Sequence, residues 1–289
     1  MRKPGVVAVG CCGLVLSGSS AIWISRHHGV RPPVQPQPTL LDRVHQVAST
    51  RPTFVKDPLR SPRPSAPRLT SWRSPLTKQC SQQDQTVRQR LVVLREQLHN
   101  QREVVSIDAS NYGKRYHLDP WQQTINPTPR LVVLHETANS LSSAINTFQT
   151  YHPNDHDQVS YHTLIARSGK VIDVVDPLLR AYGAGYSAFR GEWAVTNPDL
   201  MGSVNNFALH LSLETPRDGY LGGQTHSGYT SQQYDALAVV LDDWITRFHI
   251  APEAITTHEH VDLGGMRGDP RSFRWSELQV RMAALNHLC

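Results

Sequence analysis

An apolar run that ends in a histidine limits what this chain can fold into. Leu131, Val132, Val133 and Leu134 follow one another, and His135 comes directly after them. A short continuous apolar run is typical of a β-strand that is buried on both faces. Ligands gather outside the carboxyl ends of strands in open α/β sheets. His135 is therefore either a catalytic or metal-binding residue, or a core histidine satisfied by one hydrogen bond.

A second strand is predicted over residues 207–214, where apolar side chains alternate strictly with others. Side chains on a strand point alternately to its two faces, so one face would pack in a core. The core face would carry Phe207, Leu209, Leu211 and Leu213, and the other face would carry Ala208, His210, Ser212 and Glu214. This second face is either a solvated sheet surface or the floor of a cleft.

Neighbouring segments add further strands and helices. Residues 159–177 predict two strands joined by a turn at Ser168 and Gly169. Residues 230–248 predict an amphipathic helix with Thr230 or Ser231 as its N-cap, and residues 81–100 predict another helix. Strands and helices mixed in this way indicate an α/β domain.

The chain divides by composition into four regions. Residues 1–25 carry two basic residues near the start and then run uncharged, which is typical of a signal peptide or of a membrane anchor of about 20 residues. Residues 26–79 are rich in Pro, Arg and Ser and predict a basic linker. Residues 80–104 predict an N-terminal helix, and residues 105–289 predict the folded domain. We therefore expect an exported protein of the periplasm or cell envelope, either freed from its leader or anchored to the membrane by it.

Charge separates along the chain. Residues 26–104 carry 14 Lys and Arg against 5 Asp and Glu, a net charge of +9, whereas residues 105–289 carry 13 against 19, a net charge of −6. A flexible basic arm suits an anionic surface such as a cell wall or a membrane, although a soluble tether fits the same composition. The acidity of the domain argues against nucleic acid as a partner, and we expect a monomer.

Two cysteines, Cys80 and Cys289, lie beyond the apolar leader. Exported proteins retain disulfides, and this pair would join the start of the folded region to the last residue. The cysteine spacing does not resemble a zinc cluster. We therefore predict a disulfide between the two.

A loop near the C-terminus is dense in side chains that bind metals. Residues 256–275 read TTHEHVDLGGMRGDPRSFRW. Zinc prefers histidine and carboxylate ligands, and a catalytic zinc uses three protein ligands and leaves a fourth position for water. The candidate ligands in this loop are His258, Glu259, His260, Asp262 and Asp269. Their chemistry alone does not choose among them, and the alternative is an exposed polar loop.

Five motifs occur along the chain in a specific order: VVLHETA, SYHTLIARSGKV, AYGAGYS, NNFALHLSLE and THEHVDLGGMRGDP. In this order they resemble the zinc-dependent N-acetylmuramoyl-L-alanine amidases of the amidase-2 family, which are related to bacteriophage lysozyme-type amidases and peptidoglycan recognition proteins. The resemblance covers residues 105–289. It implies an α/β fold with a single mixed β-sheet flanked by helices, and a Zn2+ cofactor. The implied reaction is hydrolysis of the amide bond between N-acetylmuramic acid and L-alanine, in peptidoglycan or muropeptides.

The resemblance also assigns roles to residues at matching positions. Three residues match the family's zinc ligands: His135, His258 and Asp269. His260 is the rival to His258. Arg267 lies where many members keep a lysine that supports the oxyanion, and Tyr161 matches a tyrosine near the metal in several members.

Two residues depart from the family pattern. Ser212 stands where the family strand carries a glutamate that acts as the catalytic base, and Gly183 stands where many amidases have a histidine that contacts the substrate. Three candidates for the base follow: Tyr161 on the facing strand, Glu214 further along the same strand, and metal-activated water without a side-chain base. The alternative function is a peptidoglycan-binding protein of the same fold without turnover. A third is an enzyme that acts on soluble muropeptides during wall recycling.

Overall fold

The computed structural model describes residues 62–65, 67–68, 71–80, 84–220 and 222–289. The predicted leader and most of the predicted linker lie outside the described residues. These described residues belong to one compact unit, which contains every element named below. In the described part of the chain, no helix combines the length and the apolar character needed to cross a membrane.

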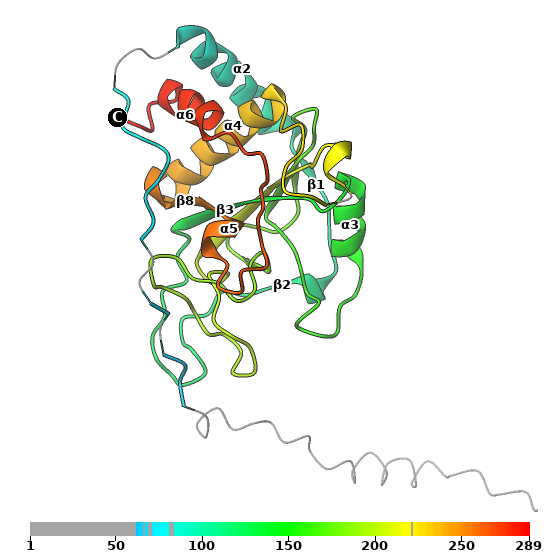
Figure 1. Ribbon diagram of the computed structural model, residues 1–289, viewed down its shortest axis with the longest axis vertical. Helices are drawn as coiled ribbons and strands as arrows, with labels where there is room; N and C mark the ends of the chain where they lie inside the picture. Colours follow the sequence, from blue (N-terminus) through cyan, green and yellow to red (C-terminus); the bar gives the residue numbers. More distant parts are fainter. Residues whose placement is uncertain (1–61, 66, 69–70, 81–83, 221) are drawn as a thin grey trace, which may run out of the picture. The chain divides into compact units, whose positions relative to one another are not determined.

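A mixed six-stranded sheet lies at the centre of this unit, with its strands in the order β1-β5-β4-β7-β3-β8 (Figure 1). The strands are β1 (Glu103–Val104), β3 (Leu131–Glu136), β4 (Thr163–Ile165), β5 (Val171–Asp173), β7 (Ala208–Leu213) and β8 (Ile255–Thr257). β3 runs parallel to β7 and β8, and β4 runs parallel to β7. β5 is antiparallel to β4 and parallel to β1. The predicted mixed sheet and the predicted turn between two strands at Ser168 and Gly169 are confirmed. A separate two-stranded ribbon pairs β2 (Tyr112–Gly113) with β6 (Arg180–Ala181).

Three helices cover one face of the sheet: α2 (Gln85–Gln101), α4 (Ser231–Phe248) and α6 (Trp275–Ala284), which lie close together in Figure 1. Their apolar sides form the main hydrophobic core with alternate residues of the central strands, such as Leu134 and Leu211. Full burial of one leucine contributes about 1.5–3 kcal/mol. Leu209, Leu211 and Leu213 therefore face the helices as predicted. The prediction is wrong for Phe207, which lies before the start of β7 and packs in a separate cluster with residues of the opposite face.

Side-chain caps determine where two of these helices begin. The Thr230 hydroxyl accepts the Gln233 backbone N–H, and the Gln233 side chain accepts the Thr230 backbone N–H, both at 3.1 Å. The Asp84 carboxylate accepts the backbone N–H groups of the second and third residues of α2. Each such cap stabilises a helix start by about 1 kcal/mol. Thr230 is thus the N-cap, and the helix predicted from residue 81 begins at Gln85.

The opposite face of the central strands carries buried polar groups. β3 and β7 are buried at every residue, and His210 and Ser212 are both 0% exposed. In register, Val133 lies beside His210 and His135 lies beside Ser212. This face packs against loops and α3 (Leu141–Gln149), so the solvated sheet surface, one of the two predicted alternatives, is excluded.

One turn of the C-terminal loop is helical. α5 (His258–Val261) follows β8 directly, so the prediction of a loop throughout residues 256–275 is wrong for these four residues. It is also wrong at the two ends of that range, where Thr256 and Thr257 belong to β8 and Trp275 begins α6. Val261 is fully buried in a cluster under the sheet edge, which holds the turn in place. A single turn is too short for apolar periodicity to reveal it.

The end of the predicted linker belongs to the domain. Leu76 is 6% exposed and joins the main core, and the Trp72 indole N–H donates to a backbone carbonyl at 2.9 Å. Cys80 forms the predicted disulfide with Cys289, with their Cα atoms 4.7 Å apart. Residues 72–79 therefore pack on the domain and are not part of a free linker. The sequence did not reveal this, because Trp72 and Leu76 lie within a Pro- and Arg-rich stretch.

Candidate metal and active site

Three predicted ligands meet at the carboxyl edge of the sheet. In the parallel pairing of β3 with β8, Leu134 lies beside Thr257. His135 and His258 are the next residues along these two adjacent segments. The backbone carbonyl of Asp269 accepts the N–H of the second residue of α5 at 3.1 Å, which holds this later segment against the turn. The ligand atoms of His135, His258 and Asp269 lie within 4.8 Å of one another.

The spacing of these atoms fits a four-coordinate zinc. Asp269 Oδ2 lies 3.3 Å from His135 Nδ1 and 3.2 Å from His258 Nδ1. Zinc holds such ligands at about 2.0–2.2 Å in a tetrahedron, which sets neighbouring ligand atoms about 3.3–3.6 Å apart. Three protein ligands leave one position open, as catalytic zinc sites require. The residues present therefore suit the metal that the resemblance implies.

The protonation states of the cluster also suit a metal. Burial lowers the pKa of His135 to about 4, and its hydrogen bond with Asp269 offsets only part of that effect. Burial acts in the opposite direction on Asp269, but hydrogen bonds from His135 and His258 outweigh it and hold the pKa of this carboxyl far below its usual range. At neutral pH the cluster thus contains a neutral His135 imidazole and an ionised Asp269, the forms that bind metals.

Two rival ligands in the same loop have other partners. His260 is exposed, and its ring packs edge-on against Trp72 with centroids 4.6 Å apart. Asp262 accepts three backbone N–H groups of the following turn, including that of Arg267 at 2.9 Å. The structure brings His258 to the cluster and leaves these two residues outside it.

Tyr161 lies directly against the first ligand. Its ring stacks on that of His135, with centroids 4.5 Å apart and planes 25° from parallel. Burial, with a smaller effect from the Asp269 charge, raises the pKa of Tyr161 well above its ordinary value. The phenol therefore stays protonated at neutral pH, so it can donate and accept hydrogen bonds but is a poor base.

Arg267 lies in the exposed part of the loop, two residues before Asp269. Its positive charge helps to lower the pKa of His135 and opposes the rise in the pKa of Tyr161. Such effects mean that the guanidinium acts on the cluster through space. This position suits stabilisation of a developing oxyanion.

Glu214 is engaged elsewhere. Its Oε1 accepts the Leu141 backbone N–H at 3.0 Å, and its Oε2 accepts the Arg167 backbone N–H at 2.9 Å. β7 ends at Leu213, so the alternation that placed Glu214 beside Ser212 does not continue to it. The carboxylate joins the start of α3 to the end of β4, and action as a base would require it to give up one of these bonds.

Two residues of the site have no role in the sequence-based assignment. His210 Nδ1 lies 3.0 Å from His135 Nε2. Glu136, next to the first ligand, accepts hydrogen bonds from His226 Nε2 at 2.8 Å, from the Tyr229 hydroxyl at 2.6 Å and from Arg271. Strand alternation did place His210 on the face of Ser212. No local sequence pattern predicts the hydrogen-bonding role of Glu136, because its partners are at least 90 residues away along the chain.

A hollow of about 600 Å³ has a mixed aromatic and polar lining. The Arg180 guanidinium lies over the rings of Tyr116 and Tyr182, at 4.9 and 5.1 Å from their centroids. Tyr182 precedes Gly183, which packs on His210, so the wall of this hollow and the buried layer behind the cluster share one segment. A guanidinium in such a lining can bind a carboxylate through charge-assisted hydrogen bonds.

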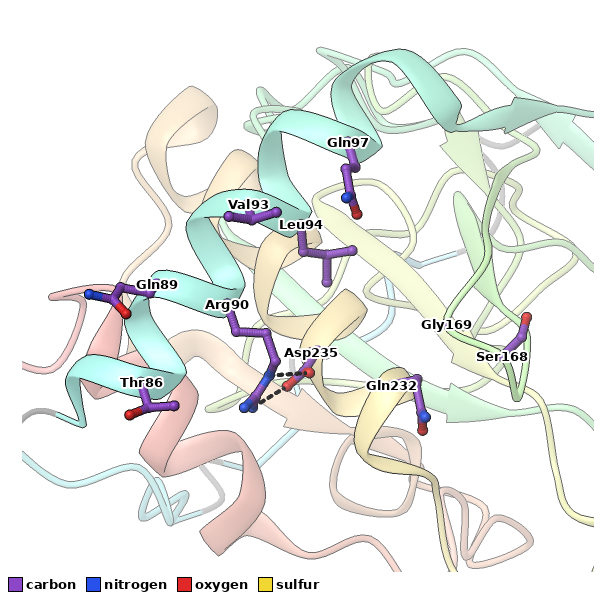
Figure 2. A pocket seen from close by; sticks show the side chains of 10 residues that line it. All are labelled: Thr86, Gln89, Arg90, Val93, Leu94, Gln97, Ser168, Gly169, Gln232 and Asp235. Atoms are coloured by element: carbon purple, nitrogen blue, oxygen red, sulfur yellow. Dashed lines mark hydrogen bonds and ion pairs between the residues drawn. The ribbon is translucent and has the colours of Figure 1, made fainter.

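A second hollow, of about 480 Å³, lies between α2 and α4 (Figure 2). The Arg90–Asp235 ion pair joins the two helices there, with Arg90 Nε 2.8 Å from Asp235 Oδ2. Val93 and Leu94 of α2 also line it. Its lining includes none of the three cluster residues, so this hollow is separate from the candidate site.

Two known amidases are similar to this chain in sequence. The AmpD amidase of Citrobacter freundii, a 1,6-anhydro-N-acetylmuramyl-L-alanine amidase, is 27% identical over 132 residues, which are 46% of this chain and 62% of AmpD. The N-acetylmuramoyl-L-alanine amidase AmiD of Escherichia coli K12 is 27% identical over 174 residues, which are 56% of this chain and 57% of AmiD. The chain thus spans less than two thirds of the length of these relatives.

A solved complex of AmiD from E. coli contains the substrate anhydro-N-acetylmuramic acid-L-Ala-D-γ-Glu-L-Lys. The match covers 59% of this chain and 65% of the AmiD chain in that structure, with 24% identity and a TM-score of 0.44. The Amidase_2 family model, described as N-acetylmuramoyl-L-alanine amidase, matches residues 125–272. This match covers just over half of the 289 residues and includes all three residues of the cluster. The chain therefore belongs to the Amidase_2 family.

Proposed function

We propose that this protein is a zinc-dependent N-acetylmuramoyl-L-alanine amidase that hydrolyses the bond between N-acetylmuramic acid and L-alanine in peptidoglycan. The observation that carries the proposal is the cluster of His135, His258 and Asp269 at the carboxyl edge of the sheet, within the residues that match the family. Both relatives are named as amidases of this bond type, which supports the same reaction here.

The chemistry divides between the metal and the residues around it. A zinc ion held by the cluster would polarise the amide carbonyl and lower the pKa of a water molecule. Arg267 would offset the negative charge that develops on the carbonyl oxygen. Because arginine does not release a proton at neutral pH, the leaving amine takes its proton from another group.

Tyr161 orients the attacking water through its hydroxyl. Its raised pKa keeps the proton in place, so the group acts by hydrogen bonding and not by proton abstraction. Ser212 is an unassisted hydroxyl and too weak a base. Glu136 and Glu214 have their carboxylate oxygens engaged by other groups. Tyr161 is therefore the residue that would orient a water molecule at the cluster, by hydrogen bonding from its hydroxyl.

The proposed place of action is the periplasm or cell envelope. The basic leader and the basic arm of residues 26–79 support export and attachment to an anionic wall. The disulfide between Cys80 and Cys289 supports the same assignment, because such bonds persist in oxidising compartments.

Ser212 favours a second candidate function, the binding of peptidoglycan without turnover. It occupies the position of the family's catalytic glutamate, and its Oγ is buried without a hydrogen-bond partner among the described residues. The intact ligand cluster argues for the enzyme, because a pure binding protein has no need of an open metal position.

Metal analysis and a wall-digestion assay on the purified protein test the proposal together. We expect stoichiometric zinc and the release of L-alanine amino groups from purified walls. His258→Ala should lose both, whereas His260→Ala, a matched change at an exposed histidine two residues away, should keep both. Bound zinc and wall binding without released amino groups would support the binding protein. Loss of zinc in His260→Ala alone would contradict the ligand assignment.

A further inference from the structure

His210 is a buried histidine beside the candidate metal ligand. It is the third residue of β7 and 0% exposed, and its Nδ1 lies 3.0 Å from Nε2 of His135. The other ring nitrogen of His135 faces Asp269. The His135 imidazole therefore has the metal cluster on one side and His210 on the other.

Close neighbours hold the His210 ring in place. The ring of His162 stacks on it nearly in parallel, with centroids 5.8 Å apart and planes at 9°, and His162 Nδ1 accepts the His210 backbone N–H at 2.9 Å. A Cβ atom on Gly183 would lie 2.4 Å from Cγ and Nδ1 of His210. The imidazole thus occupies space that is open only because residue 183 is a glycine.

The hydrogen-bonding rules of imidazole restrict what this contact can be. A neutral imidazole donates from one nitrogen and accepts at the other. If His135 gives Nδ1 to a metal, its hydrogen is on Nε2 and points to His210 Nδ1. His210 then accepts with Nδ1 and carries its own hydrogen on Nε2.

The second nitrogen of His210, Nε2, has an unusual environment. Among the residues that the structure describes, His210 Nε2 is buried without a hydrogen-bond partner. Buried polar atoms are normally paired, so an unpaired one needs an explanation. The contact of Nδ1 with His135 provides it, because histidines that bind metals nearly always direct their second nitrogen to a fixed partner.

We propose that His210 is a positioning residue that holds His135 in the tautomer that binds the metal through Nδ1. This inference rests on the proposed function. In the metal-free protein the bond between the rings runs the other way: His210 Nδ1–H donates to His135 Nε2, and His135 Nδ1–H donates to Asp269. Each ring keeps one proton in both states. On loading, one proton passes from His210 to His135, the proton on His135 Nδ1 leaves to water, and His210 Nε2 takes one from water.

Zinc affinity in the whole protein, measured by competition with a chelator, is the first test. His210→Ala should bind zinc about 10–100-fold more weakly, as expected when the partner of a metal-binding histidine is lost. His210→Asn keeps an acceptor oxygen and should recover part of that loss. Gly183→Ala keeps the imidazole but displaces it, and should also weaken binding. Gly185→Ala is the matched control, because an added Cβ there meets nothing within 4 Å, and it should keep the parent zinc affinity.

Nitrogen-15 NMR of the parent protein gives a readout that a merely structural role would not move. In the zinc-loaded form, His135 Nε2 and His210 Nε2 should carry hydrogens and His210 Nδ1 should not. Coordination through His135 Nε2, or parent zinc affinity in both His210→Ala and Gly183→Ala, would overturn the inference. If one of these results is found while the parent protein binds zinc and digests walls, the inference about His210 is wrong but the proposed function is retained. A parent that binds no zinc would refute both.

Discussion

Acidification of the metal-free protein should destabilise it before its carboxylates are protonated. His135, His162 and His210 are all 0% exposed and lie in one buried layer. Burial lowers the pKa of His135 to about 4 and that of His162 to about 3, and it lowers the pKa of His210 as well. In an unfolded chain a histidine titrates near pH 6.5. Below that pH the unfolded state binds more protons than the folded state, so stability falls as the pH drops from about 6.5 toward 4.

The size of this effect follows from the number of buried imidazoles. Each histidine that is protonated only in the unfolded state lowers the free energy of unfolding by about 1.4 kcal/mol per pH unit. Between about pH 6.5 and pH 5 this amounts to about 1.6 kcal/mol for one histidine and about 5 kcal/mol for three. Domains have a total stability of about 5–15 kcal/mol, so the loss is large enough to measure.

Urea unfolding with a chelator present, followed by tryptophan fluorescence from about pH 7 to about pH 5, measures the slope. His162→Gln retains a carbonyl oxygen that can accept the His210 backbone N–H, and it should reduce the slope by about one third. His260→Ala, at an exposed histidine, should leave the slope unchanged. A free energy of unfolding that stays level across this range would refute the reasoning, because all three imidazoles would then have to titrate in the folded state as they do in the unfolded chain.

Four further changes separate catalysis, stability and attachment. Tyr161→Phe should lower kcat by about 10²-fold with zinc retained, as expected when one preorganised hydrogen-bond donor is lost. Glu214→Gln should mainly lower Tm, because the carboxylate receives the backbone N–H groups of Leu141 and Arg167; normal Tm with lost turnover would instead make Glu214 the base. Reduction of the Cys80–Cys289 disulfide should cost about 2–4 kcal/mol in urea unfolding, and an unchanged midpoint would mean that the bond adds nothing. Deletion of residues 26–61 should weaken wall binding at low salt more than turnover of a soluble muropeptide, because exposed charges are screened over about 8–10 Å; equal losses would rule out an electrostatic arm.

Local sequence patterns were sufficient for the central strands. The apolar run before His135 and the alternation through Leu213 each depend on burial of adjacent side chains, which a sequence records directly. The Thr230 cap is equally local. The packing of Trp72 and Leu76 was not predictable in this way, because their partners lie near the other end of the chain.

The residues of the candidate site likewise fall into those that the sequence predicts and those that only the folded structure reveals. The order of motifs led to His135, His258 and Asp269, and the structure brings these residues together. The orientation of Glu214 was missed because alternation was extended one residue past the end of the strand. Glu136 was missed because it is recognisable only from side chains that folding brings to it.

The segment of residues 72–80 determines the smallest part of the chain that can fold as described. A version that begins at residue 105 would leave Cys289 as an unpaired thiol and would remove Leu76 and all of α2 from the main core. It would also remove the ring contact between Trp72 and His260, which lies two residues beyond His258. New modules or anchors can therefore be joined to this domain ahead of Trp72 without loss of core contacts, whereas a cut closer to the first central strand removes part of the support behind the metal-binding turn.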